Sequence, residues 1–147
     1  MIMPGSSGET VAIVGDGIVR ASQAVQSGGV VVLNGTAAST IYVGLPFTST
    51  LVTMKPNIQA ASGTTAGMPK KWAELYVDLL DTSGVKINGD QIPFRTVGDV
   101  VGAAVTPFTG FKKMSTLGWN DGRITIEQSL PLPCTVRGIY GTLEIGD

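Results

Sequence analysis

Two segments of alternating apolar residues, each broken by Gly, Pro or an Asp-Gly pair, constrain this chain more than any other feature of its sequence. One covers residues 41–49 and the other covers residues 118–126, and the second continues through Pro131 and Pro133 to the segment 143–147. Alternation with turn residues at its boundaries predicts paired, half-buried strands. Neither segment has an arrangement of side chains typical of catalysis, so both indicate a chain specialised in shape and assembly.

Further strands are expected along the rest of the chain. Residues 11–14 and 18–20 flank a tight turn, and residues 30–33 are apolar at every position, which predicts a central strand covered on both faces. A long strand with mixed faces is expected from Thr48 to about Ile58.

Residues 70–80 alternate most strictly. One expected face carries Ala73, Leu75, Val77 and Leu79, and the other carries Trp72, Glu74, Tyr76 and Asp78. A helix is the alternative here, because Trp72, Leu75, Tyr76 and Leu79 also fit a period of 3.6 residues. The eight-residue alternation and the missing N-cap favour the strand.

Turn signals separate these segments. The residues 15–17, 88–90 and 120–122 each combine Gly with Asp or Asn, and the last group is expected to close a hairpin. Residues 60–67 are small and polar, which predicts a mobile loop. Residues 94–105 leave a short helix open, although two Gly and several Val argue against it.

Together these elements predict an all-β fold: a small β-sandwich or barrel of about ten short, mostly antiparallel strands with at most one short helix. The length of 147 residues fits one domain. We expect residues 1–9 to form a flexible N-terminal segment without the features of a signal peptide, and residues 10–147 to form a single β-rich domain.

Charge is scarce in this sequence. Charged residues make up 14% of the chain, against roughly 25% in an ordinary soluble domain, and the net charge is −1. A neutral surface resists association poorly. The balance predicts at most non-specific contact with DNA, so the doublets Lys70-Lys71 and Lys112-Lys113 are interpreted as solvated strand edges or loops. No apolar run approaches the length of a membrane helix, and no membrane partner is expected.

The residue types exclude several kinds of chemistry. The chain has no His and a single Cys, Cys134, which removes Ser-His-Asp and Cys-His triads, zinc sites and an intrachain disulfide. A carboxylate pair, Glu74 with Asp78, is the remaining catalytic option, and a solvated strand face explains both residues equally well. Residues 88–90 and 120–122 lack the spacing of a calcium loop and are interpreted as turns. We therefore expect no enzyme, metal or cofactor.

Aromatic residues offer a binding role instead. Trp72, Tyr76 and Trp119 could stack on sugars or dock a protein, since these rings combine buried area with a polar group. Core packing is the alternative for at least two of the three. Expected contact segments are residues 60–67, 108–111 and 118–121, which add Phe108, Phe111, Asn120 and Asp121 to the candidate interface or ligand contacts.

An ordered set of motifs resembles the C-terminal region of the tail nozzle proteins of short-tailed phages, of the tail tubular protein B type. The matching segments are Val-Gly-Leu-Pro-Phe-Thr-Ser at 43–49, Trp-Asn-Asp-Gly-Arg-Ile-Thr-Ile at 119–126, Pro-Leu-Pro-Cys-Thr-Val at 131–136 and Ile-Gly-Asp at 145–147. Residues 11–17 match the opening of that region. The resemblance implies a virion tail component, assembled as a ring around the DNA exit channel, without catalysis.

Two departures from this family matter. Its members carry a large propeller-like body ahead of this region, which this chain lacks, and their middle strand is often Arg-rich where this chain has Lys70 to Glu74. Two explanations fit these departures. The chain is either an excised domain of such a protein or a stand-alone protein that decorates a tail or capsid. The sequence thus predicts a structural component of a phage virion that assembles with copies of itself and with other virion proteins. A β-module that binds glycans or a host surface is the alternative.

Overall fold

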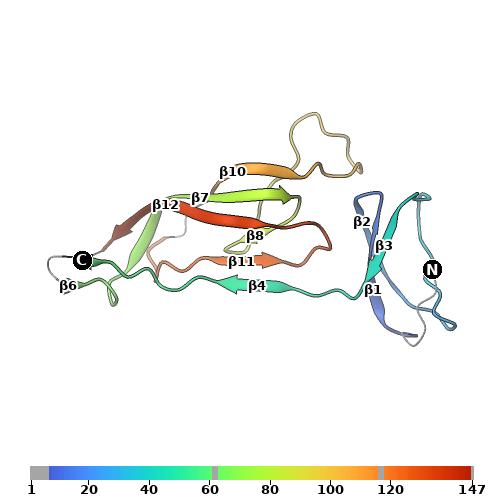
Figure 1. Cartoon of the computed structure of the whole chain (residues 1–147), viewed down its shortest axis with the longest axis horizontal. Coiled ribbons are helices and arrows are strands. Elements are labelled where there is room, and N and C mark those ends of the chain that lie inside the picture. The colour runs from blue at the N-terminus through green and yellow to red at the C-terminus, as the bar shows by residue number, and fades with distance from the viewer. Residues whose placement is uncertain (1–6, 61–62, 116–117, 147) are drawn as a thin grey trace.

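The computed structural model describes residues 7–60, 63–115 and 118–146. Within these ranges the chain forms twelve strands and no helix, and every paired ladder of strands is antiparallel. The all-β prediction is confirmed. Its sheets stay open and do not close into a barrel. Figure 1 shows an elongated molecule in which a two-layered body occupies one side and a small separate sheet stands at the other end.

The body is a sandwich of two sheets. The first sheet has the order β10-β7-β12, with strands Phe108–Met114, Lys70–Thr82 and Val136–Ile145. The second has the order β4-β11-β8-β9, with strands Ser49–Val52, Thr125–Gln128, Lys86–Ile87 and Asp90–Gln91. A hydrophobic core lies between them, centred on the fully buried Leu75, Val77 and Leu79 of β7 and on Ile87 of β8.

The central strand β7 confirms the strict alternation predicted for residues 70–80, except at its start. β12 pairs Thr142 with Glu74 but Leu143 with Trp72, so Ala73 is an extra residue in the ladder. Such a bulge reverses the alternation on one side of it. Trp72 therefore packs against the core, although the alternation predicts it on the outer face with Tyr76.

The N-terminal sheet has the order β2-β1-β3, with strands Ile18–Ala24, Thr10–Gly15 and Ile41–Gly44. The hairpin between β1 and β2 turns at Asp16 and Gly17, whose φ angles of 50° and 77° fit a type I′ turn. Val11, Ile13 and Val25 form its own small core. The expected flexible segment 1–9 falls mostly outside the described residues, but Gly8 donates a hydrogen bond to the Val25 carbonyl.

The prediction of a central strand at residues 30–33 is wrong. Only Val30 makes a bridge, to Gln26. Val31 and Leu33 pack against the small core, while Val30 and Val32 are exposed. The segment covers the sheet with one side and faces solvent with the other, which an uninterrupted apolar run does not reveal. The strand expected from Thr48 to Ile58 is also shorter, since β4 ends at Val52.

The turns predicted at residues 88–90 and 120–122 have different roles in the structure. Asn88 and Gly89 have φ angles of 52° and 88°, so the turn predicted there is confirmed, and it closes the β8–β9 hairpin. Residues 120–122 do turn the chain, but they close no hairpin, because β10 pairs with β7 whereas β11 pairs with β4 and β8. They connect the two layers of the sandwich instead.

Two loop predictions can also be compared with the structure. Residues 94–105 form an irregular loop without a helix. In the segment 60–67, β5 (Gln59–Ala60) and β6 (Gly63–Thr64) pair as a short hairpin, and residues 61–62 lie outside the described residues.

Candidate functional site

The most unusual surface of the molecule is an uncharged edge that runs along β3 and β4. The sequence has no charged residue between Arg20 and Lys55, and β3, β4 and their connection lie within that stretch. Seven large apolar side chains are exposed there. We call them the apolar edge: Ile41, Tyr42, Leu45, Phe47, Leu51, Val52 and Met54. Phe47 is 78% exposed and Met54 is 89% exposed, which is more than isolated surface hydrophobics explain.

β4 presents a free strand edge within this surface. It pairs with β11 on one side, and no described strand pairs with its other side. Thr53 donates its N–H to the Ile124 carbonyl of the chain leading into β11. Because backbone groups alternate between the two sides of a strand, the N–H and C=O groups of Thr50 and Val52 point away from the sheet. β4 can therefore accept another strand.

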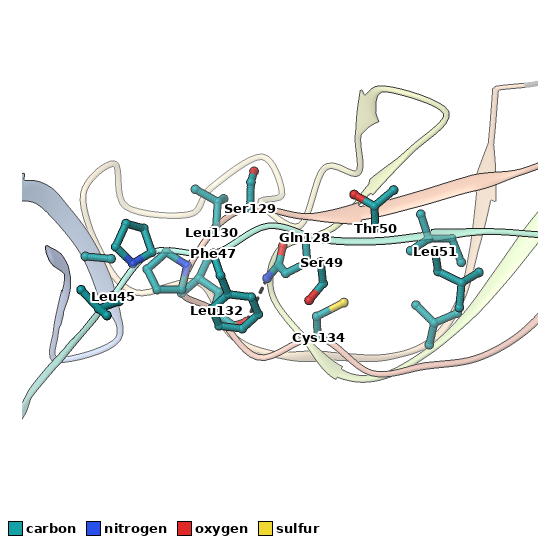
Figure 2. Close-up of a pocket in the computed structure, with 15 residues that line it drawn as sticks. Leu45, Phe47, Ser49, Thr50, Leu51, Gln128, Ser129, Leu130, Leu132 and Cys134 are labelled. Atoms are coloured by element: carbon teal, nitrogen blue, oxygen red, sulfur yellow. Dashed lines mark hydrogen bonds between the residues drawn. The ribbon is translucent and has the colours of Figure 1, made fainter. Parts of the chain in front are cut away.

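A groove of about 630 Å³ adjoins the apolar edge (Figure 2). Leu45, Phe47 and Leu51 of the apolar edge line this groove. The chain between β11 and β12 contributes Leu130, Leu132 and Cys134. Gln128 donates its side-chain N–H to the Leu132 carbonyl at 2.9 Å, which holds this connection in place. None of the fifteen lining residues is charged, so the groove suits apolar side chains.

Cys134 is the one reactive group of the groove. Burial raises the pKa of its thiol above the ordinary value, because the thiolate loses hydration there. A raised pKa leaves the less nucleophilic thiol form at neutral pH, and the groove lining contains no cation or general base that could activate it. Cys134 therefore acts as a small apolar residue at this surface.

The loop of residues 95–107 presents a second apolar surface, which we call the valine loop. Val97, Val100 and Val101 are exposed, and Val101 is 96% exposed. The guanidinium of Arg95 turns inward and donates to the carbonyls of Val100 and Ala103 at 3.0 and 2.6 Å. These internal hydrogen bonds fix the loop shape, so its valines are held outward at little further entropy cost.

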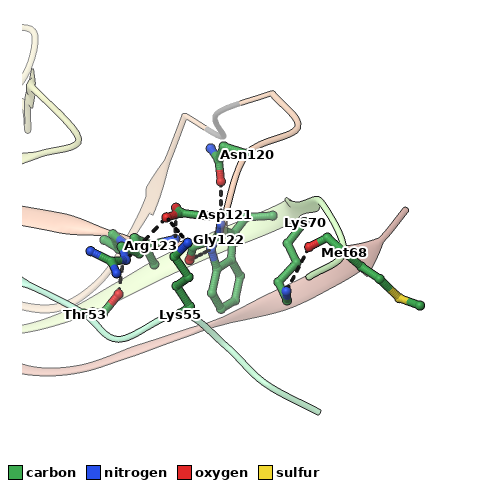
Figure 3. A network of polar contacts seen from close by, with 10 residues as sticks. Thr53, Lys55, Met68, Lys70, Asn120, Asp121, Gly122 and Arg123 are labelled. Carbon is green, nitrogen blue, oxygen red and sulfur yellow. Dashed lines mark hydrogen bonds and ion pairs between the residues drawn. The ribbon is translucent and has the colours of Figure 1, made fainter. Parts of the chain in front are cut away.

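Three of the predicted contact residues form a structural network at the start of β7 (Figure 3). Asn120 accepts the N–H of Gly122 with its side chain, and Trp72 donates its indole N–H to the Gly122 carbonyl at 2.9 Å. Asp121 faces Lys55 and Arg123, both at 3.4 Å. The hydrogen bond from the Arg123 backbone N–H, aided by Lys55, lowers the pKa of Asp121. These contacts stabilise the turn and account for Trp72, Asn120 and Asp121 without a ligand.

Lys70 corrects the interpretation of the Lys70-Lys71 doublet as a solvated edge. Lys70 is fully buried, and its ammonium donates to the carbonyls of Thr65 and Met68 at 2.7 and 3.0 Å. Its stem fills the space beside Gly122. The bulge at Ala73 is the reason, since it places Lys70 on the inner side of β7 with Trp72. Lys71 remains at the surface and pairs with Glu144 at 3.6 Å.

The remaining aromatic candidates occupy three different places. Phe108 packs against the core, with the Lys112 ammonium 4.6 Å from its ring centroid. Trp119 is exposed and lies beside Gly146. Tyr76 and Phe111 share the outer face of the sheet β10-β7-β12, where they meet Tyr140. The predicted site residues thus do not form a single site.

The carboxylates considered for catalysis each face a cation. Glu74 pairs with Lys113 at 2.9 Å, and Asp78 pairs with Arg137 at 2.6 Å. Among the described residues, no three metal-binding side chains of the His, Cys, Asp or Glu type gather in one place. The same part of the chain contains no helix that is long and apolar enough to cross a membrane.

No protein-family model and no curated protein matches this chain. The candidate site therefore depends on geometry alone. Sequence reasoning missed the apolar edge, although a signal was present. The absence of charge from residue 21 to residue 54 covers the whole apolar edge, and its large apolar residues at positions 41–54 are the part of that stretch that indicates a contact surface.

Proposed function

We propose that this chain is a structural subunit of a phage particle, in the tail or bound to the capsid, and that it assembles with copies of itself and with neighbouring virion proteins. The observation that carries the proposal is the apolar edge. Soluble proteins protect free strand edges with charges, bulges or very short strands. β4 is four residues long and carries neither a charge nor a bulge, so it is suited to contact another subunit.

The other free edges of the described strands are protected, unlike that of β4. β10 carries Lys112 and Lys113, and β12 carries Arg137 in a bulge. β2 carries Arg20, and β5, β6 and β9 have only two residues each. Association through any of these edges would bring like charges together or pair few residues. Among the described strands, the free edges of β3 and β4 lack this protection against pairing. This selectivity favours a specific contact over non-specific association.

We further propose a head-to-tail contact, in which the valine loop of one copy lies against the apolar edge and groove of the next. A ring or filament of identical subunits needs two different complementary patches on each chain. The apolar edge and the valine loop are two such patches, and their lining residues do not overlap. The ordered motifs at 43–49, 119–126 and 131–136 are the basis for placing the assembly in a phage tail.

Sedimentation velocity over a range of concentrations tests the assembly. The unmodified chain should associate, whereas Val52→Lys and Val101→Lys should each sediment as monomers because a lysine ammonium cannot be buried in an uncharged contact. Mixing the two variants should give a one-to-one dimer, since each retains one intact patch. Val32→Lys, an exposed valine outside both patches, is the matched control and should associate normally.

The possible outcomes separate the parts of the proposal. A monomeric native chain at millimolar concentration would contradict assembly through its own copies. Normal association of Val101→Lys, with monomeric Val52→Lys, would contradict the head-to-tail contact and support edge-to-edge pairing. Electron microscopy of particles labelled with an antibody against this chain tests the location, and absence of label from the particles would contradict a virion role.

A further inference from the structure

An aromatic corner lies on the outer face of the sheet β10-β7-β12, on a part of the molecule that the assembly proposal does not use. Phe111 and Tyr140 are 60% and 54% exposed. Their ring centroids are 5.7 Å apart and their planes meet at 69°. Phe111 lies opposite Asp78 of β7, whereas Tyr140 lies opposite Tyr76, so the two rings meet diagonally across the central strand.

Gly138 leaves room on the sheet for the Tyr140 ring. A Cβ atom at Gly138 would lie 3.0 Å from both Cε2 and the hydroxyl oxygen of Tyr140, so the Tyr140 ring occupies the space over a residue that has no side chain. Tyr140 is nevertheless about half exposed, so part of its ring is open to solvent. Phe111, steeply inclined to it, forms a wall. A flat ligand can therefore stack on Tyr140 and contact Phe111 with its edge.

Polar groups border the corner without giving it a net charge. Arg137, the extra residue in the β12 bulge, donates from Nη2 to Asp78 at 2.6 Å. Lys113 donates to Glu74 at 2.9 Å and lies over the Tyr76 ring, with its ammonium 5.6 Å from the ring centroid. Each cation is thus matched by a carboxylate. The Arg137 side chain is 45% exposed, and a guanidinium has five N–H donors, so further donors remain for a ligand hydroxyl.

We propose that this corner binds the uncharged pyranose rings of a glycan. An exposed aromatic floor suits the apolar C–H face of a sugar ring, and the Arg137 guanidinium and the Tyr140 hydroxyl suit its hydroxyl groups. Charge decides against a nucleic acid, because its phosphates need unpaired cations, whereas Lys113 and Arg137 are already paired. Trp72 and Trp119, the more obvious sugar-stacking candidates in the sequence, take no part in this corner.

Saturation-transfer NMR on the full chain tests the proposal with two neutral probes, cellohexaose and the hexamer of β-1,4-linked N-acetylglucosamine. At least one probe should receive saturation at its ring C–H protons, and its affinity should change little between low and high salt. Tyr140→Ala and Phe111→Ala should each weaken binding about tenfold, the scale of losing one aromatic stacking contact. Trp119→Ala, which removes an equally exposed ring elsewhere, should leave the affinity unchanged.

Tyr140→Phe separates the two contributions of that residue. It keeps the stacking ring and removes the hydroxyl, so it should weaken binding less than Tyr140→Ala. Because its ring still fills the same space, Tyr140→Phe should stay folded even if Tyr140→Ala disturbs the sheet. No saturation of either probe at millimolar concentration would overturn the proposal. Equal binding by Tyr140→Phe, Phe111→Ala and the native chain would also overturn it, as would a salt-sensitive preference for oligothymidine. Each result is independent of whether the chain assembles.

Discussion

Gly141 is the glycine of the sheet β10-β7-β12 with the least room for a side chain. A Cβ atom there would run into the backbone carbonyl of Glu74 and lie 3.0 Å from the Trp72 ring. Gly141→Ala should lower the free energy of unfolding by about 3 kcal/mol, the upper end for overpacking, because a backbone atom cannot turn aside. Urea denaturation measures the change. The strand glycine Gly44 has open space where a Cβ would lie, so Gly44→Ala should change stability little. Equal effects of the two substitutions would contradict this account.

Asp16 makes the N-terminal sheet sensitive to acid. Its carboxylate accepts the backbone N–H groups of Thr40 and Ser39 at 2.8 and 3.0 Å, and these hydrogen bonds lower its pKa, with a smaller contribution from Arg20. A carboxyl whose pKa is lower in the folded state stabilises the protein above its unfolded pKa, and this contribution is lost as the pH falls through the folded value.

The native chain should therefore lose more stability below about pH 4 than Asp16→Asn does, since the amide does not titrate. Asn also tolerates the positive φ of 50° at this turn, so the variant should keep the hairpin. Denaturation midpoints measured from pH 7 to pH 2.5 check the difference. Parallel curves for the two proteins would show that this carboxylate does not contribute.

At the scale of elements, alternation predicted the strands that bury one face. Leu75, Val77 and Leu79 lie in the core as expected because their period matches the pleat. The bulge at Ala73 could not be predicted, since it depends on how β12 pairs with β7. Its consequences were missed with it, namely the buried Lys70 and the inward-facing Trp72.

The candidate surfaces were predictable only in part. The sequence shows that residues 21–54 lack charge, but it does not show that β4 is an edge strand, which follows from its pairing with β11 alone. Tyr76 and Phe111 were predicted as contact residues. Their partner Tyr140 was not, because the aromatic corner depends on the register that brings β10 and β12 to opposite sides of β7.

On the scale of the whole molecule, two hydrophobic clusters occupy different parts of the chain. One lies between the sandwich sheets, and the other lies against the N-terminal sheet. No described strand of the N-terminal sheet pairs with a strand of the sandwich. A single domain was predicted from the length, and that stays a prediction. The separate clusters favour at least partly independent opening of the N-terminal sheet.

Native-state hydrogen exchange checks this independence. Ile13→Ala removes a fully buried side chain from the smaller cluster and should destabilise β1 to β3 by about 2–5 kcal/mol. Amides of β7 should keep their protection. Leu79→Ala, the matched change in the sandwich, should expose β7 amides instead. Loss of protection throughout the chain in both variants would show one cooperative unit.

The central claim is that the free edge of β4 contacts another subunit, and hydrogen exchange of its outward amides tests this most directly. The N–H groups of Thr50 and Val52 should exchange quickly in dilute monomer, because no described strand pairs with that edge. In the concentrated, assembled protein their exchange should slow about tenfold or more, while amides on the free edge of β10 stay unchanged. Equal exchange at both concentrations, with assembly present, would contradict the account.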